Sequence, residues 1–479
     1  MPHNKSCRPD GFPARFYQKN WSTVGDCLTK ALLDFLNNGH LLKELNNTFI
    51  PLIPKFPLPK STNDFRSISL CNASYKIASK VLVNRLKPHL NSFLSPYQNG
   101  FILGRGAQDN ILMAQEITYT IRHSKSKKND LVALKIDMIQ YSVIINGQTT
   151  PPFKPTCNLR QGDPLSHILF ALCTEPLSSS LLTHQAKKPL KDFCADSGQI
   201  INYHKSSITF SSATPSHSKL SILEAFNINC ANTFGNYLVI HFDIATNRRD
   251  IFNNIVDKIK KRILGWKAKF LNFAGRITLI KSVLQSILVY HMGICTFPIA
   301  TLNEIDKILA NILWDGAHNT NIHWVNWDFL CTDKNSGNLS FKHLHHFNLV
   351  LLARNGWRLI SHPHTPLSNL FKSKYYPTTT PLNPVTKNNP SWTWHSLHSG
   401  LEKINQHMTC IITNGSSTNI WNDKWVPSIY PGTPINYYNP EANPPIQTLF
   451  LNFSSVTISG TPPFLEISSL LTLWTKSLA

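Results

Sequence analysis

Leu159-Arg160-Gln161-Gly162-Asp163-Pro164-Leu165-Ser166 stands between a predicted hairpin and an apolar segment. In the hairpin, an apolar strand runs into Asn146-Gly147, the dipeptide most typical of a type I′ turn. Asp163 as N-cap and Pro164 as first helical residue predict that a helix begins here. Gly162 has no Cβ, so a base or a sugar can approach its backbone closely. Such a loop presents a cation, an amide and a flexible glycine to a polyanion.

This octapeptide, behind a hairpin and ahead of a helix, resembles the template- and nucleotide-contacting motif in the palm of reverse transcriptases of plant LINE-type non-LTR retrotransposons. The alternative is an ordinary capped loop. The resemblance continues in sequential order over residues 10 to about 425. It implies an α+β fold with polymerase-like fingers, a palm and a helical thumb, and it implies RNA-directed DNA synthesis. Arg160 and Gln161 would contact template or nucleotide, and Gly162 would give them clearance.

The composition is that of a basic globular chain. Its 479 residues include 47 Lys and Arg against 26 Asp and Glu, a formal net charge of +21, which suits a phosphate backbone and also an anionic membrane surface. The ten cysteines are spread singly, without Cys-x-x-Cys, so neither a disulfide framework nor a zinc knuckle is expected. No run of about 18 apolar residues appears. We expect an intracellular protein, nuclear or cytoplasmic, that is neither secreted nor membrane-spanning.

Segments before residue 130 resemble the fingers of the same enzymes. A predicted helix that ends at Gly39 precedes two predicted strands, and a second helix covers about residues 74 to 90. The resemblance places Arg66 near template and incoming triphosphate, with Lys55 and Gly104-Arg105 along the nucleic-acid backbone. For the single basic residues the alternative is a solvated surface charge.

Asp137 closes the apolar strand predicted over residues 131 to 138. A carboxylate at that position should face an open mouth, because an unpaired buried charge is costly. It is therefore a metal-ligand candidate, and it matches the first catalytic aspartate of the family's palm. The implied cofactor is Mg²⁺, bound as a pair of ions that several acidic oxygens must hold. The resemblance also places Lys205 near the phosphates.

The palm is truncated in two places. Only four positions separate Asp137 from Tyr141, whereas a strand, a crossover helix and a returning strand need roughly 30 residues. The family's second acidic source is an Asp-Asp hairpin, and no Asp-Asp dipeptide occurs in this sequence. Asp192 and Asp196 share a helical face by spacing, but we place them in a helix end. We therefore expect impaired catalysis; the alternative is a non-catalytic basic RNA- or DNA-binding protein derived from a retrotransposon.

Residues 251 to 298 resemble the thumb. Ile251, Ile255, Ile259 and Ile263 recur every four residues and predict a helix with one apolar stripe. A basic face opposite that stripe suits tracking of a duplex backbone, although it is also what a solvated helix bundle shows. The cations assigned to the nucleic-acid backbone here are Lys260, Lys261, Arg262, Lys267 and Arg276.

The remaining chain is rich in tryptophan and resembles the connection region of the same enzymes. His343, His345 and His346 stand without a cysteine pair and are interpreted as a surface cluster. The implied partners are an RNA template and a DNA primer, or an RNA–DNA hybrid, and no membrane. The predicted regions are fingers at 1–130, truncated palm at 131–215, thumb at 216–300, tryptophan-rich connection at 301–425 and loop-rich tail at 426–479.

Overall fold

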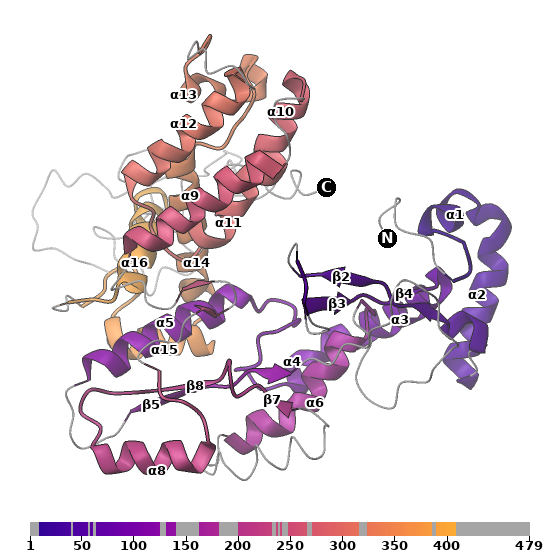
Figure 1. Cartoon of the computed structure of the whole chain (residues 1–479), viewed down its shortest axis with the longest axis horizontal. Helices are drawn as coiled ribbons and strands as arrows, with labels where there is room; N and C mark the ends of the chain where they lie inside the picture. Colours follow the sequence, from indigo (N-terminus) through magenta and orange to yellow (C-terminus); the bar gives the residue numbers. More distant parts are fainter. Residues whose placement is uncertain are drawn as a thin grey trace, which may run out of the picture. The chain divides into compact units, whose positions relative to one another are not determined.

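The computed structural model describes residues 9–39, 42–55, 58–60, 64–124, 131–139, 162–181, 200–231, 236–237, 240–241, 248–265, 271–315, 323–385 and 389–408. The chain divides into two units, residues 1–401 and 402–479, and the first holds the elements that position the candidate site. Among the described residues it combines helices with small two-stranded sheets (Figure 1), which confirms the α+β class.

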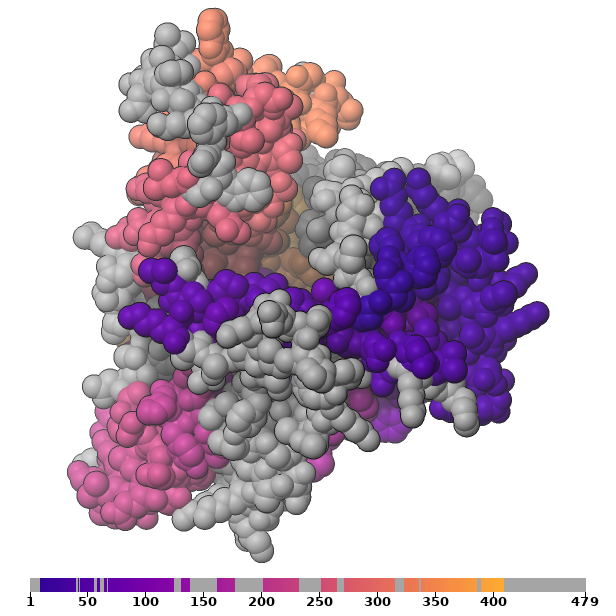
Figure 2. All heavy atoms as spheres, turned by 45° about the vertical axis from the view of Figure 1, so that its right-hand side comes forward, coloured from indigo at the N-terminus to yellow at the C-terminus, as the bar shows by residue number. Residues whose placement is uncertain are grey.

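The chain opens with two helices, α1 (Ala14–Lys19) and α2 (Trp21–Asn38). Gly39 ends α2 in a left-handed conformation, with φ of 72°, as the sequence predicted. In α2 the structure buries only Gly25. Figure 2 shows the side chains of this region, in indigo, at the right of the face it presents.

The strands predicted before and after residue 60 form, but each is broken in two. After the 3₁₀ turn η1 (Lys43–Asn46) come β1 (Thr48–Phe49) and β2 (Leu52–Pro54), interrupted at Pro51 because proline cannot donate to a ladder. The returning segment gives β3 (Phe65–Ser67) and β4 (Leu70–Cys71). β2 pairs antiparallel with β3, and β1 pairs antiparallel with β4.

One core cluster joins the helices next to these strands. Its helices are α3 (Ala73–Leu86), η3 (Lys87–His89), α4 (Leu90–Phe93) and α6 (Ser166–Leu181). The buried side chains that connect them are Val83, Leu90, Leu94, Ile102, Ile168 and Ala171. This cluster packs the start of α6, next to Gly162 and Asp163, against α3 and α4.

α5 (Ala107–His123) contacts both a sheet and the C-terminal helices (Figure 1). The sheet is β5 (Val132–Lys135) paired antiparallel with β8 (Ser207–Phe210), and β6 (Met138–Ile139) pairs in the same way with β7 (Ile200–Ile201). The two strands that flank Asp137, β5 and β6, therefore pair with segments that follow α6 in the sequence. Helix α8 (Ser216–Phe226) and the pair β9 (Asn236–Tyr237) and β10 (Ile240–His241) follow.

The largest core is helical. It is built by α9 (Arg248–Gly265), α10 (Phe273–Leu279), the π-helical turn η5 (Ile280–Leu284), α11 (Gln285–Met292), α12 (Ile299–Asp315) and α13 (Trp327–Leu330), with residues of α14 (Leu344–Ser361). The 3₁₀ turn η6 (Lys334–Ser336) lies between α13 and α14 in the sequence. Ile255, Val256 and Ile259 of α9 are buried in it, as the four-residue spacing predicted.

The continuous segment Phe273–Met292 is long and apolar enough to cross a bilayer by length and composition. Its Ile280, Leu284 and Leu288 are fully buried in the helical core. Of the 18-residue apolar window in this segment, 28% is buried, and length and composition alone are weak grounds for a membrane span.

α15 (Pro366–Tyr375) and α16 (Trp392–His407) complete the described helices. Together with α14 they meet α5 through buried polar side chains. Arg358 of α14 forms an ion pair with Asp109 of α5 at 2.7 Å, and Glu116 of α5, fully buried, accepts a hydrogen bond from the Tyr375 hydroxyl at 2.7 Å. α5 is therefore tied to helices that lie far from it in the sequence.

Candidate functional site

Asp137 lies between two strand ladders. β5 ends two residues before it and β6 begins one residue after it. Its backbone N–H donates to the Ser206 hydroxyl at 3.0 Å, and its backbone carbonyl accepts from the Asn202 N–H at 2.7 Å. The Asn202 side-chain amide approaches the Asp137 carboxylate at 3.4 Å. The half-buried carboxylate thus sits beside an amide contributed by the turn that follows β7.

That turn also carries Lys205. Its backbone N–H donates to the Asn202 carbonyl at 3.1 Å, and its side chain is exposed. The structure therefore brings the turn of Lys205 next to Asp137. The predicted roles of Asp137 at a metal and of Lys205 near the phosphates stay predictions. Sequence reasoning missed Asn202 and Ser206; the signal was a short polar segment between two apolar strands, which predicts a turn that returns the chain to the first strand. Burial lowers the pKa of nearby Lys135, and the negative charge of Asp137 opposes that shift.

The described residues at this point do not fit a pair of divalent cations. Two such ions need several acidic oxygens, and Asp137 has an amide beside it. Across the described ranges, no group of three or more His, Cys, Asp or Glu side chains could hold a metal. Asp192 and Asp196 lie outside the described residues.

The stretch around Gly162 packs against the segment between β3 and β4 and against α3. Gly162 has a φ of +104°, and a Cβ there would lie 3.2 Å from the Ser69 carbonyl oxygen. The close approach at this glycine is thus to the chain's own backbone. The buried Asp163 carboxylate accepts from the Tyr75 hydroxyl at 2.7 Å and from the Leu165 N–H at 3.0 Å.

α6 begins at Ser166, two residues later than predicted, because Asp163 caps the preceding turn rather than the first helical residue. The motif is a capped loop, and its cap is held by a tyrosine from α3. Arg160, Gln161 and the predicted hairpin at Asn146-Gly147 lie outside the described residues.

Lys55 and Arg66 occupy one hairpin. Ile53 stands opposite Arg66 in the β2–β3 register, and the Lys55 N–H donates to the Asp64 carbonyl at 2.7 Å. Because strand side chains alternate between faces, Lys55 lies on the same face as Ile53 and Arg66. Both cations are exposed. The structure brings them together, and their contact with nucleic acid stays a prediction.

Arg105 has a structural role. Its guanidinium donates to the carbonyl oxygens of Ser95 at 2.5 Å and Gln98 at 2.6 Å, which closes the loop after α4. Burial lowers its pKa, and the charge of Glu175 opposes that shift. Gly104 adopts a φ of +81°, and its carbonyl accepts from Arg358 at 2.9 Å. These contacts of Gly104 and Arg105 stabilise the loop without any bound phosphate.

The predicted thumb cations fall into two groups. Lys260 pairs with Glu304 of α12 at 3.1 Å, while Lys261 and Arg262 are exposed on the same helix. Arg276 instead donates to the Leu313 carbonyl at 3.2 Å, near the end of α12, a position where a cation stabilises the helix dipole. Lys267 lies outside the described residues. The exposed group matches the predicted basic face, and Arg276 is a helix cap.

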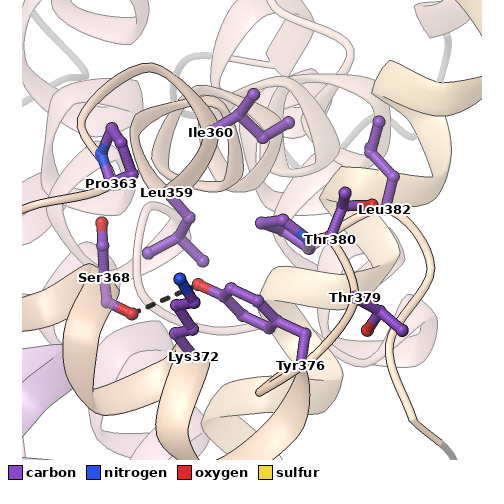
Figure 3. Close-up of a pocket in the computed structure, with 10 residues that line it drawn as sticks. Leu359, Ile360, Pro363, Ser368, Lys372, Tyr376, Thr379, Thr380 and Leu382 are labelled. Atoms are coloured by element: carbon purple, nitrogen blue, oxygen red, sulfur yellow. Dashed lines mark hydrogen bonds between the residues drawn. The ribbon is translucent and has the colours of Figure 1, made fainter. Parts of the chain in front are cut away.

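A cavity of about 290 Å³ opens between α14 and α15 (Figure 3). Tyr376 lines it and donates to the Ser368 carbonyl at 3.3 Å, and burial raises the pKa of Tyr376 to about 12. Lys372 is the cation in its lining. None of the predicted site residues lines this cavity, so it is separate from the Asp137 site.

The three histidines predicted as a surface cluster lie at the start of α14. The rings of His343 and His346 stack with centroids 4.2 Å apart, and His345 meets His346 edge-on at 5.6 Å. His343 Nε2 lies 3.7 Å from the exposed carboxylate of Asp328. The three imidazole rings therefore pack on one another beside the carboxylate of Asp328.

Residues 53–190 match the family model described as reverse transcriptase (RNA-dependent DNA polymerase). A putative ribonuclease H protein of Arabidopsis thaliana is 31% identical over 182 residues, which are 37% of this chain and 29% of that protein. An uncharacterized mitochondrial protein of Arabidopsis thaliana is 31% identical over 150 residues, 31% of this chain and 97% of that protein. The uncharacterized 149 kDa protein of transposon TX1 from Xenopus laevis is 25% identical over 391 residues, 66% of this chain and 29% of that protein.

The chain spans less than a third of the length of the ribonuclease H and transposon relatives. The matched model covers Asp137, the fingers-like hairpin and the palm motif around Gly162. The mitochondrial relative, by contrast, is covered almost completely. Together these matches show that the chain belongs to the retrotransposon-type reverse transcriptases, the RNA-dependent DNA polymerase family.

Proposed function

We propose that this reverse transcriptase domain is catalytically impaired and retains the binding of an RNA–DNA hybrid. Family membership implies a divalent-metal-dependent domain that binds an RNA template and a DNA primer. One observation carries the proposal. The side-chain amide of Asn202 lies beside the carboxylate of Asp137. An amide donor satisfies a carboxylate oxygen that a metal would otherwise use.

The proposed impairment is a lack of acidic ligands for the two Mg²⁺ ions. Nucleotidyl transfer needs one Mg²⁺ to activate the 3′-hydroxyl and a second to steady pyrophosphate, with the charge stabilisation supplied by the ions. The palm gap supports the deficit from the sequence side, since no Asp-Asp dipeptide exists in the chain. A single acidic ligand cannot position both ions.

The binding function has separate support. We assign fingers to residues 1–130, with α1 to α5 and β1–β4, the truncated palm to residues 131–215, with β5–β8 and α6, and the thumb to residues 216–300, with α8 to α11. The exposed Lys55 and Arg66 of the fingers and the exposed Lys261 and Arg262 of the thumb supply cations for a phosphate backbone. None of these four requires a metal to act.

Primer extension on an RNA template with Mg²⁺ or Mn²⁺ tests the catalytic half of the proposal. The expected result is no product from the full chain, together with binding of a labelled RNA–DNA hybrid that Asp137→Ala leaves unchanged. Product that disappears in Asp137→Ala would show an active polymerase with further ligands and would overturn the impairment. Absence of hybrid binding would overturn the retained function.

A gain-of-binding variant sharpens the test. Asn202→Asp places a second carboxylate beside Asp137, and the Asp side chain keeps the oxygen that accepts from the Lys205 N–H at 3.3 Å. We expect Mn²⁺ to raise the melting temperature of Asn202→Asp, because a cation relieves the repulsion of the paired carboxylates, and to leave the wild type and Asn202→Ala unchanged. A shift of equal size in the wild type would show that a complete site already exists.

A further inference from the structure

The loop between α4 and α5 is rigid, yet it exposes apolar side chains. Arg105 holds it through the carbonyls of Ser95 and Gln98, and Ile102 anchors it in the core, 4% exposed. On the solvent side of the same loop, Phe101 is 64% exposed and Leu103 is 69% exposed. A loop tied down on one side is able to present fixed side chains on the other.

Phe101 adopts a strained backbone conformation. Its φ is +66°, in the left-handed region that bulky side chains rarely enter. Such strain persists where the surrounding structure enforces it, and it concentrates at binding sites. Here it coincides with an aromatic ring that the fold leaves in solvent.

The exposed ring has an aromatic partner. The centroid of Phe101 lies 4.7 Å from that of His167 on α6, with the rings tilted by 42°. Burial lowers the pKa of His167, and the positive charges of Lys87 and Lys80 lower it further. The negative charge of Asp163 opposes that shift. Both lysines therefore lie within electrostatic range of the imidazole.

We propose that Phe101 and His167, with Lys80 and Lys87 beside them, form a stacking platform for an unpaired base of single-stranded nucleic acid. A base has an apolar face that stacks on an aromatic ring and is linked to a phosphate that a lysine attracts, which is the combination found here. The net charge of +21 favours a polyanionic occupant over an apolar protein surface. The proposal rests on the proposed function in that both require nucleic-acid binding by this chain.

The test is fluorescence anisotropy of the full chain with single strands of about 16 nucleotides, as RNA and as DNA, and with an RNA–DNA hybrid. Phe101→Leu keeps apolar bulk but removes the aromatic face. We expect it to weaken single-strand binding about 5- to 150-fold while hybrid binding changes less, and Phe101→Trp to restore the affinity. The RNA and DNA arms show whether the 2′-hydroxyl contributes.

Leu103→Ala is the matched control, since Leu103 is equally exposed on the same loop but has no aromatic face. We expect it to bind like the wild type, and an equal loss in Leu103→Ala and Phe101→Leu would indicate a general apolar docking surface and overturn the stack. Lys80→Ala and Lys87→Ala should each reduce the salt dependence of single-strand binding, by a slope of about 0.7 for each phosphate that is no longer neutralised. Unchanged slopes would remove both lysines from the platform.

Phe101→Gly separates binding from folding. Glycine accepts a φ of +66° without strain, so a ring retained for binding predicts lost single-strand affinity at an unchanged or higher melting temperature. A lower melting temperature with intact affinity would make the ring a packing element and overturn the proposal. If the wild type binds hybrid but no single strand, the platform fails and the proposed function stands; if it binds neither, the proposed function fails.

Discussion

Glu116 is a fully buried carboxylate that ties α5 to the C-terminal helices. It forms an ion pair with Lys374 and accepts hydrogen bonds from the hydroxyls of Tyr375 and Ser391. Burial raises the pKa of Tyr375, and the negative charge of Glu116 adds to that shift, so the phenol stays a donor. The carboxylate is satisfied by partners that only the folded chain brings to it.

Glu116→Gln should therefore destabilise the fold. It removes the charge opposite Lys374, whose side chain is 20% exposed, and breaking such a pair costs about 3 kcal/mol. Glu304→Gln is the matched control, because it breaks the half-exposed Lys260–Glu304 pair and should cost about 0–1 kcal/mol. Urea denaturation of both variants measures the difference in free energy of unfolding, and equal losses would contradict the importance of burial.

Asp306 makes stability depend on pH. Burial raises the pKa of its carboxyl to about 6, while the Trp327 indole N–H, which donates at 2.9 Å, lowers it. His343 lowers and Asp328 raises the same pKa. Since the pKa is higher in the folded chain, the stabilising contribution is fully present below the unfolded pKa of about 4 and is lost as the pH rises through about 6.

Asp306→Asn should remove this loss, because the amide stays neutral and its oxygen can still accept from Trp327. At pH 7 the variant should be more stable than the wild type by about 1 kcal/mol, after allowance for solvent screening. Melting temperatures of the variant and the wild type, measured between pH 4 and 7, check this prediction. The difference between the two melting temperatures should grow as the pH rises. A stability difference between Asp306→Asn and the wild type that stays the same from pH 4 to pH 7 would contradict the assignment of this titration to Asp306.

The sequence named candidate site residues, but it did not give the hydrogen-bond partners that the structure shows for each of them. Asp137 could be singled out because a carboxylate at the end of an apolar strand is expected to face an opening rather than the core. Arg105 and Arg276 were predicted as phosphate contacts, but the structure also gives both guanidiniums carbonyl oxygens to cap. The sequence alone does not distinguish an arginine that binds backbone carbonyl oxygens from one that binds a phosphate. The guanidinium donates to oxygen atoms in both cases, and neither partner is a neighbour in the sequence.

At the scale of elements, the exposed cations of α9 differ in whether binding to a phosphate would break an existing ion pair. Lys260 already pairs with Glu304, while Lys261 is exposed one residue further along the helix. Lys261→Ala should lower the salt dependence of hybrid binding by a slope of about 0.9, and Lys260→Ala should lower it less. Affinities at several salt concentrations measure both slopes, and a larger effect of Lys260→Ala would place the nucleic acid on the α12 side of the helix.

The helices could be predicted from spacing, and the strand pairs could not. The apolar stripe of α9 is local information, and it corresponds to the residues buried in the core. The pairing of Val132 with Phe210 joins segments separated by the whole of α6, and its register depends on tertiary contacts. The break of the first predicted strand at Pro51 was visible in the sequence as an edge signal, but which short strand each half would join was not.

At the scale of the whole molecule, the excess of positive charge is a property that no single element carries. Of the net charge of +21, residues 1–130 contribute +10 and residues 216–300 contribute +7, so binding should draw on many weak phosphate contacts rather than on one strong site. This makes affinity depend on ionic strength much more than on base sequence. It also means that the proposed binding does not depend on the proposed loss of catalysis, because phosphate contacts need no metal.

We therefore expect the affinity of the full chain for an RNA–DNA hybrid to fall steeply with salt, by about 10³- to 10⁵-fold between about 50 and 200 mM if 6–10 phosphates are contacted. Two hybrids of unrelated sequence should show the same slope and nearly the same affinity. Adding EDTA should change neither, because cations on lysine and arginine replace the metal in this contact. A shallow slope, or an affinity abolished by EDTA, would mean that a metal-dependent site dominates binding and would argue for a working catalytic centre.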